Sequence, residues 1–255
     1  MKMKLTIGYL YASGMNVYGD RGNVLTLVQR CRWRGIKVDV VERNVRERSS
    51  LSQFDILFAG GGQDRDQSAV SRDLGSYTGK ALIEAVENDV VVLTICGTYQ
   101  LLGRYFETQS GDTLPGVGIF DAWTVAGKHR FVGDVVIHAE HAGEEFDLVG
   151  FENHGGLTFL GETAQPLGTV RIGSGNNGSD GFEGATYRHA FGTYLHGPLL
   201  PKNPAFADHL IRLAARRRFG DDFELPPLDD SVELIARSAA LNRIRSRGRV
   251  KSGVR

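Results

Sequence analysis

The sequence has few cysteines, no long hydrophobic run and no excess charge of either sign. Its cysteines, Cys31 and Cys96, lie far apart and neither belongs to a C-x-x-C pair, which excludes a disulfide framework. Lys plus Arg number 30 and Asp plus Glu number 30, so the charge indicates neither a nucleic-acid nor a membrane partner. No segment approaches the roughly 18 apolar residues of a membrane-spanning helix, and the first apolar run is too short for a secretory signal. We therefore expect a cytoplasmic protein whose thiols stay reduced.

The only strong charge bias lies at the C-terminal end of the chain. We expect residues 1–240 to form a single domain and residues 241–255 to form a basic, flexible tail. A solvated terminus is the simpler interpretation, and contact with an acidic partner is the alternative. The basic residues of this tail are Arg243, Arg245, Arg247, Arg249, Lys251 and Arg255.

The first half of the chain alternates short β-branched runs with stretches of helical periodicity. Four runs are predicted to be strands, and between them lie two segments, 23–34 and 65–88, with apolar residues at helical spacing. Strand–helix–strand alternation is typical of a parallel sheet with helices on both faces. The predicted strands are 4–11, 36–42, 55–59 and 90–95.

The second half has a different pattern, in which glycines separate short strand-like runs from about residue 116 to 196. We expect these runs to form an antiparallel extension of the same sheet. Two helices, over 203–218 and 231–244, are predicted to follow. The expected fold class is therefore α/β, with a central, mostly parallel sheet.

Cys96 is the strongest candidate for a catalytic nucleophile. It directly follows the buried run VVVLTI and is followed by Gly97 and a helical run, as in a nucleophile elbow. A thiol in that position lies at a helix N-terminus, which favours the thiolate. The N–H of Gly97 could also face a developing oxyanion. A lone cysteine is otherwise most often a buried apolar residue, and Cys31 is predicted to be one.

A thiolate nucleophile needs a base and an oxyanion pocket. The candidate base is His196, in the segment TYLHGP at the end of a predicted strand. The candidate pocket is the run AGGGQD over 59–64, because consecutive glycines allow backbone N–H groups to approach a ligand closely. The carboxyl ends of parallel strands meet at one edge of a sheet, so these segments are expected to lie together.

Two nucleotide-binding patterns and one metal-binding pattern are rejected. The run GSGNNG over 173–178 matches G-x-G-x-x-G, but no helix is predicted after it. The run GSYTGK over 75–80 has one residue too few for a P-loop. His138 and His141 are three residues apart on a predicted strand, so they point to opposite faces. We therefore expect no metal, no cofactor and no ATP site in this chain.

ICGTYQLLG together with the downstream YLHGP resembles the class I glutamine amidotransferases, in the branch that contains the cobyric-acid and cobyrinate amidases. The resemblance implies a flavodoxin-like α/β fold. MNVYGDRGN, GGGQDRDQ, GFENHGG and GSGNNGSDGFEG are more specific and resemble the family of glutaminase subunits of lipid II isoglutaminyl synthases. The resemblance extends from about residue 5 to 215.

The resemblance implies a role for eight residues of this chain. Cys96 would attack the side-chain amide of L-glutamine and form a γ-glutamyl thioester, and His196 would act as the base. The other six would supply oxyanion N–H groups or bind glutamine: Gly62, Gly97, Gln100, Arg130, Asn153 and His154.

One departure from the class I pattern concerns the group that orients the base. Those enzymes usually have Glu two residues after the catalytic His, and here that position is Pro198. A Cys–His pair works better when a third group fixes the tautomer of the imidazole. The resemblance implies that an Asp of a partner synthetase fills this role, which makes the isolated chain a weak glutaminase.

Amide formation requires activation by ATP, so the ligase step is expected on a second protein. The resemblance implies a heterodimer with a Mur-ligase-like synthetase, to which this chain delivers ammonia. The synthetase would amidate the D-glutamate α-carboxyl of lipid II. Two alternatives stay open at this point: an amidotransferase for another acceptor such as a corrin-type carboxylate, and a stand-alone hydrolase with a Cys elbow.

Overall fold

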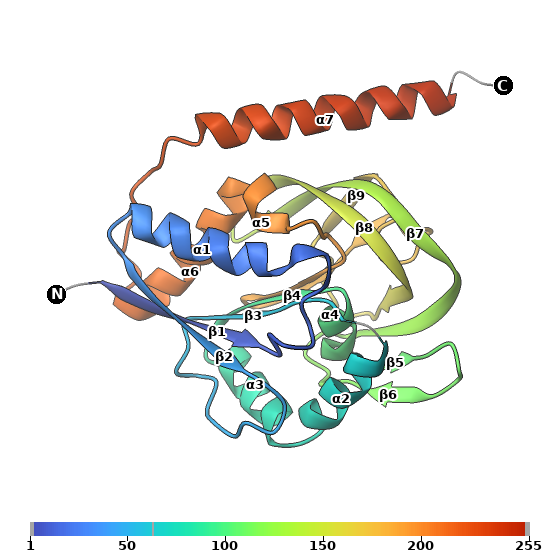
Figure 1. Ribbon diagram of the computed structural model, residues 1–255, viewed down its shortest axis with the longest axis horizontal. Coiled ribbons are helices and arrows are strands. Elements are labelled where there is room, and N and C mark those ends of the chain that lie inside the picture. The colour runs from blue at the N-terminus through green and yellow to red at the C-terminus, as the bar shows by residue number, and fades with distance from the viewer. Residues whose placement is uncertain (1–2, 63, 253–255) are drawn as a thin grey trace.

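The computed structural model describes residues 3–62 and 64–252, and its centre is a six-stranded sheet in the order β11-β12-β4-β3-β1-β2 (Figure 1). All neighbouring pairs in it are parallel except β11 and β12. The four strands predicted in the first half are confirmed. The strands are β1 (Lys4–Leu10), β2 (Lys37–Arg43), β3 (Ile56–Ala59), β4 (Val91–Ile95), β11 (Ala185–Tyr187) and β12 (Ala190–Thr193).

Helices cover both faces of this sheet because its inner strands are apolar on both sides. Every residue of β3 and β4 is buried, as expected for strands that run between two helical layers. On β3, Ile56 and Phe58 pack with α1 and α6, whereas Leu57 and Ala59 pack with α2 and α3. The helices of this unit are η1 (Val17–Gly19), α1 (Arg21–Trp33), α2 (Asp64–Leu74), α3 (Tyr77–Glu87), α4 (Gly97–Leu102), α5 (Leu199–Lys202) and α6 (Pro204–Phe219).

The helix predicted over 65–88 is divided into α2 and α3. Ser76 breaks it with extended backbone angles, φ −110° and ψ −143°. Gly79 lies so close to the end of α2 that a Cβ atom there would be 1.9 Å from the carbonyl oxygen of Leu74. The tight turn between the helices therefore requires glycine at position 79, a constraint that apolar periodicity does not reveal.

Most strands of the second half form a separate sheet, in the order β10-β9-β7-β5-β6 with β8 paired to β7. The predicted antiparallel extension of the central sheet is confirmed only for β11, which pairs antiparallel with β12, while β12 itself is parallel to β4. The prediction was wrong for the other strands: β7 pairs with β8 along most of their length and with β9, and β8 meets the end of the central sheet only at the isolated bridge between Phe151 and His196. They are β5 (Tyr105–Glu107), β6 (Thr113–Pro115), β7 (Ala122–His141), β8 (Glu144–Leu160), β9 (Gly168–Ile172) and β10 (Phe182–Glu183).

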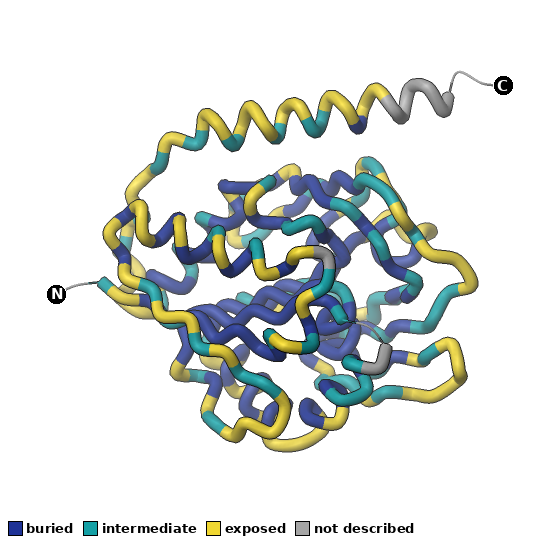
Figure 2. The backbone as a smooth tube through the Cα atoms, viewed as in Figure 1, coloured by how far each residue is buried: buried dark blue, intermediate teal, exposed yellow. Residues whose placement is uncertain are grey.

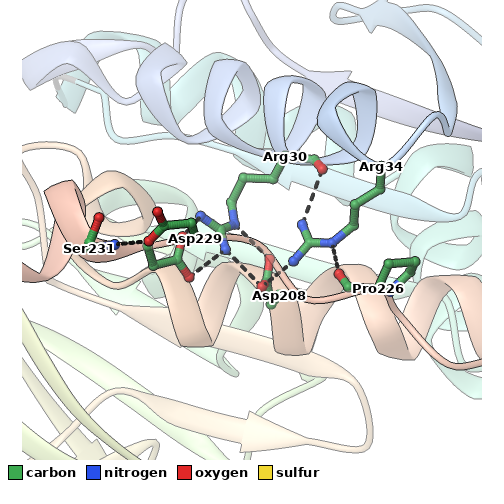
Figure 3. Close-up of polar contacts among 7 residues, drawn as sticks. Arg30, Arg34, Asp208, Pro226, Asp229 and Ser231 are labelled. Carbon is green, nitrogen blue, oxygen red and sulfur yellow. Dashed lines mark hydrogen bonds and ion pairs between the residues drawn. The ribbon is translucent and has the colours of Figure 1, made fainter.

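The segment that follows α6 is tied to the body by buried ion pairs (Figure 3). The guanidinium of Arg30 donates to the carboxylates of Asp208 and Asp230, at 2.6 to 2.9 Å. Arg34 donates to Asp208 and to the carbonyl oxygen of Pro226. The Arg30 side chain is only 2% exposed, so these contacts fix the segment that leads into the last helix.

The last helix, α7 (Ser231–Ser252), lies along the outside of the molecule, and its residues 231–246 are largely exposed (Figure 2). It is longer than the predicted 231–244, so the predicted flexible tail is helical from 241 to 252, and residues 253–255 lie outside the described residues. Ile244 anchors it by packing on Val136 and Val149 of the second sheet. None of the described helices is both long and apolar enough to cross a membrane.

Candidate active site

Cys96 lies in a strained turn between β4 and α4. Its backbone angles are φ +52° and ψ −108°, which a residue with a Cβ atom rarely adopts. The N–H of Cys96 donates to the carbonyl oxygen of Thr193 at 2.8 Å, which ties the turn to the end of β12. The predicted strand-to-helix turn is present, and its strain is carried by the cysteine itself.

Gly97 is required because a neighbouring helix packs against it. Its φ is not positive; instead, a Cβ atom at this position would lie 2.4 Å from Nε2 of Gln67. The absence of a side chain lets α2 approach the first turn of α4. Gln67 is buried there and donates to Oε1 of Gln100 at 2.7 Å.

His196 follows β12 and is fully buried. Its backbone exchanges two hydrogen bonds with Phe151 of β8, at 2.8 and 3.1 Å, so both sheets hold it in place. Its Nδ1 lies 3.3 Å from Oδ1 of Asp20, and its imidazole also forms a hydrogen bond with Cys96. Burial alone lowers the pKa of His196, but the bonds to Asp20 and Cys96 outweigh burial and raise the pKa to about 10. A raised pKa favours the thiolate–imidazolium pair.

The predicted glycine pocket lies directly against Cys96 and His196. A Cβ atom on Gly61 would be 3.1 Å from Cε1 of His196 and 3.2 Å from Cβ of Cys96. The N–H of Gly61 donates to Oδ2 of Asp20 at 2.7 Å. A Cβ atom on Gly62 would be 2.2 Å from Sδ of Met15. The close approach of this turn to the Cys–His pair therefore depends on glycine.

A cavity of about 810 Å³ opens in front of Cys96. It is large enough for a small polar substrate such as an amino acid. Gly97 and His196 do not line it, but each contacts a residue that does. Six of the eight predicted site residues line the cavity: Gly62, Cys96, Gln100, Arg130, Asn153 and His154.

His154 lines this cavity as a neutral imidazole. Its Nδ1 is 2.8 Å from the carbonyl oxygen of Gly156, which only accepts, so Nδ1 carries the proton. Burial lowers the pKa of His154 to about 4, so the ring is neutral at pH 7. Its Nε2 atom is buried, and the backbone of Gly175 also interacts with the ring.

Arg130 and Asn153 form the outer part of the cavity wall. The guanidinium of Arg130 donates to Oδ1 of Asn153 at 2.8 and 3.2 Å and to its carbonyl oxygen at 2.9 Å. Arg130 is on β7, within the irregularity between Ala126 and Phe131 where the register with β8 shifts. This irregularity places an exposed, oriented cation at the mouth of the cavity.

Gln100 is held by the protein at both ends of its amide. It accepts from Gln67 and donates from Nε2 to the hydroxyl of Tyr194 at 3.0 Å. Tyr194 in turn contacts the hydroxyl of Thr158 at 2.6 Å. This chain of hydrogen bonds fixes the cavity wall next to Cys96.

Three residues of this arrangement were not predicted: Asp20, Gln67 and Tyr194. Asp20 belongs to the segment MNVYGDRGN, which was noted only as part of the resemblance. A separation of 176 residues from His196 hides their contact. The orienting group of His196 was predicted to come from a partner protein, but a carboxylate of this chain occupies that position. Among the described residues, no group of three or more His, Cys, Asp or Glu side chains could hold a metal ion.

Comparison with solved structures agrees with the observed fold. A crystal structure titled as a glutamine amidotransferase matches with a TM-score of 0.53 and 17% identity, over 82% of this chain and 98% of that chain. A chain of PurLQS from Thermotoga maritima matches with a TM-score of 0.52 and 15% identity, over 77% of this chain and 88% of that chain.

Relatives with named functions are similar over nearly the whole chain. The GatD subunit of lipid II isoglutaminyl synthase (glutamine-hydrolyzing) from Staphylococcus aureus is 42% identical, over 94% of this chain and 96% of the relative. The subunit of the same name from Streptococcus pneumoniae is 40% identical, over 89% of this chain and 86% of the relative. A probable cobyric acid synthase from Methanococcus maripaludis is 35% identical over 59% of this chain, which covers only 32% of that protein.

The family model of the CobB/CobQ-like glutamine amidotransferase domain matches residues 6–204. This range runs from β1 through the central sheet, the cavity and His196 to the start of α6. It therefore contains the whole Cys–His arrangement and excludes α7. The chain belongs to the family of CobB/CobQ-like glutamine amidotransferases.

Proposed function

We propose that this chain is the glutamine-hydrolysing subunit of a lipid II isoglutaminyl synthase. The observation that carries the proposal is the pairing of Cys96, in its strained turn, with a buried His196 of raised pKa beside an open cavity. The similarity to two subunits with this name, over most of the length of each, supports the choice within the family.

The reaction begins when the Cys96 thiolate attacks the amide carbon of the glutamine side chain. His196 holds the thiol proton and transfers it to the leaving nitrogen, so ammonia leaves and a γ-glutamyl thioester remains on Sγ. The N–H groups of Gly62 and Gly97 stabilise the negative charge on the carbonyl oxygen during the attack. Strain at Cys96 holds the thiol in a fixed position.

Hydrolysis of the thioester completes the cycle. His196, now neutral, accepts a proton from a water molecule, and the resulting hydroxide attacks the thioester carbon. Glutamate leaves and the proton returns to the Cys–His pair. The net reaction converts glutamine and water into glutamate and ammonia, so the chain needs no redox or metal cofactor for this step.

Substrate recognition is assigned to the wall of the cavity. Arg130, oriented by Asn153, binds the α-carboxylate of glutamine, because a guanidinium offers a planar set of donors to a carboxylate. His154 lines the same cavity as a neutral ring and is assigned to the shape of the pocket around the substrate.

The ammonia is proposed to be consumed by a Mur-ligase-like partner that binds ATP and amidates the D-glutamate α-carboxyl of lipid II to D-isoglutamine. Such a division of labour gives this chain a heterodimeric partner and contact with lipid II only through that partner. The names of the two similar proteins as subunits support it.

The test is ammonia release from glutamine, followed by lipid II amidation with the co-purified synthetase and ATP. Wild type is expected to release ammonia and to support amidation. Cys96→Ser and His196→Ala are expected to lose both, and free ammonium salt should restore amidation but not glutamine hydrolysis. Ammonia release without amidation of lipid II would rule out this acceptor and favour another carboxylate.

A further inference from the structure

We infer that Asp20 is the positioning residue that orients His196, so that the glutaminase triad is completed within this chain. This inference rests on the proposed function, because it deepens the account of the same site. Asp20 holds His196 Nδ1 at 3.3 Å and the N–H of Gly61 at 2.7 Å, one with each carboxylate oxygen.

Asp20 is held in place by burial and by its backbone contacts. The side chain is fully buried, and so is the imidazole that it contacts. Asp20 follows η1 and directly precedes α1, where the N–H of Asn23 donates to its carbonyl oxygen at 2.9 Å. A carboxylate that accepts from Nδ1 leaves Nε2 as the atom that exchanges a proton with the nucleophile.

Pro198, which stands where a class I enzyme usually has glutamate, packs against the helix that begins directly after Asp20. A Cβ atom on Gly22 would lie 2.4 Å from Cγ of Pro198, so the first turn of α1 packs directly on the proline. At the next residue of α1, Oδ1 of Asn23 accepts from the N–H of Leu200 at 2.8 Å. Pro198 thus stands where the class I enzymes usually have glutamate. Its packing against α1 places Asp20, just before that helix, beside the imidazole of His196.

Two other buried carboxyl groups lie near His196 but are engaged elsewhere. Glu183 accepts from the N–H of Tyr194 at 2.6 Å and from the hydroxyl of Thr193. Glu152 accepts from the N–H groups of Ser174 and Gly175. The thiol of Cys96 and the neutral imidazole of His154 face His196, the hydroxyl of Tyr9 faces Asp20, and the exposed guanidinium of Arg21 acts on Tyr9.

The second oxygen of Asp20 links the base to the glycine turn. Gly61 lies between Asp20 and the Cys–His pair, with room for no side chain, and Gly62 follows it at the cavity. One carboxylate therefore fixes both the imidazole and the turn whose next N–H is assigned to the oxyanion. Its removal is expected to affect turnover more than substrate binding.

The experiment uses the full chain and two readouts, glutaminase kinetics and the rate at which iodoacetamide alkylates Cys96 between pH 5 and 10, followed by mass spectrometry. Asp20→Asn is expected to lower kcat on the order of 100-fold with KM changed less than about 3-fold. Its alkylation rate at pH 7 is expected to fall about 10-fold, and the pH midpoint of alkylation to rise toward that of an ordinary thiol.

The matched control is Asp55→Asn. Asp55 is also a buried carboxylate that accepts from a backbone N–H, that of Thr6 at 2.7 Å, but it lies at the opposite end of β3. The Asp55→Asn variant is expected to have a lower free energy of unfolding than wild type and to keep the wild-type alkylation profile of Cys96. Asp20→Glu is the second variant and should keep a profile closer to wild type than Asp20→Asn does.

The outcomes separate this inference from the proposed function. Alkylation profiles of Asp20→Asn and wild type that coincide would overturn the role of Asp20, whatever the glutaminase activity. Equal shifts in Asp20→Asn and Asp20→Glu would also overturn it, since they would indicate a structural role only. A wild-type chain that hydrolyses no glutamine, but whose Cys96 responds to Asp20→Asn as expected, would contradict the proposed function and leave the positioning role standing.

Discussion

The imidazole of His154 lies flat on the phenol ring of Tyr194, with ring centroids 3.6 Å apart and planes within 5°. Tyr194 is fixed through its hydroxyl by Gln100 and Thr158. The stack therefore fixes the orientation of the His154 ring in the cavity wall. A wall that is already ordered loses little entropy when the substrate binds.

His154→Phe tests the part of the ring nitrogens in ordering this wall, because it keeps an aromatic ring on Tyr194 and removes both nitrogens. KM for glutamine is expected to rise about 10-fold, because the hydrogen bond from Nδ1 to the carbonyl oxygen of Gly156 is lost and this part of the cavity wall can shift. Since the pKa of His154 is lowered to about 4, the wild-type KM should not change through this residue between pH 6 and 9. Steady-state kinetics at several pH values measure both effects, and an unchanged KM in the variant would refute the assignment.

Gly61→Ala tests the close approach of the glycine turn. The new methyl group would lie 3.1 and 3.2 Å from His196 and Cys96, so the pair must separate or the turn must shift. We expect kcat to fall by at least about 10-fold, because misplacement of reacting groups by a fraction of an ångström is costly. Gly133→Ala on β7 is the control, since a Cβ atom there meets nothing within 4 Å. Equal activity in the two variants would show that the turn tolerates a side chain.

The raised pKa of Glu183 predicts that the free energy of unfolding depends on pH. Burial raises its pKa to about 8 in the folded chain, from 4.5 for an ordinary glutamate. Between these values the folded state binds one more proton than the unfolded state, so the free energy of unfolding falls as the pH rises, by at most about 1.4 kcal/mol per pH unit. The contribution is complete below pH 4.5 and is lost as the pH rises through 8.

Glu183→Gln removes this titration while keeping an acceptor for the N–H of Tyr194. Urea unfolding at intervals from pH 5 to 9 should show a flatter curve for the variant than for wild type. Parallel curves would mean that Glu183 is ionised in the folded chain at neutral pH.

Arg30→Met tests the buried ion pairs that hold the segment before α7. The variant leaves Asp230 without its guanidinium partner and Asp208 with that of Arg34 alone. Loss of one partner from a buried pair is expected to lower the free energy of unfolding by about 3 kcal/mol. Lys4→Gln, which breaks the exposed pair with Asp39, should cost less than about 1 kcal/mol. Similar costs, measured by urea unfolding, would contradict the structural role assigned to Arg30.

Local patterns predicted much of the fold because each reflects a local physical constraint. The apolar run before Cys96 predicted a buried strand, and the following glycine and helical run predicted the turn. A helix was predicted over 231–244, but its packing on the second sheet was not, because the contact of Ile244 with Val136 and Val149 joins residues far apart in the sequence. The second sheet was not predicted either, since alternation shows that a segment is a strand but not which strand it pairs with.

Site residues were predicted when their residue type and sequence position alone indicate reactivity. They were missed when their role depends on a contact between residues far apart in the sequence. Cys96 and His196 stand out as reactive side chains at strand ends. Asp20 does not, because nothing near it in the sequence indicates that α1 begins beside His196. The neutral state of His154 was also hidden, since it follows from burial and from the carbonyl oxygen of Gly156.

The central claim is that Cys96 forms a covalent γ-glutamyl intermediate during glutamine hydrolysis. The most direct measurement is mass spectrometry of the full chain, quenched in acid during turnover with glutamine and digested to locate the adduct. The account predicts a glutamyl thioester on the peptide that contains Cys96, in wild type and in Cys31→Ala, and none in Cys96→Ser. Glutamine hydrolysis that continues at the wild-type rate in Cys96→Ser, with no adduct in any variant, would contradict it.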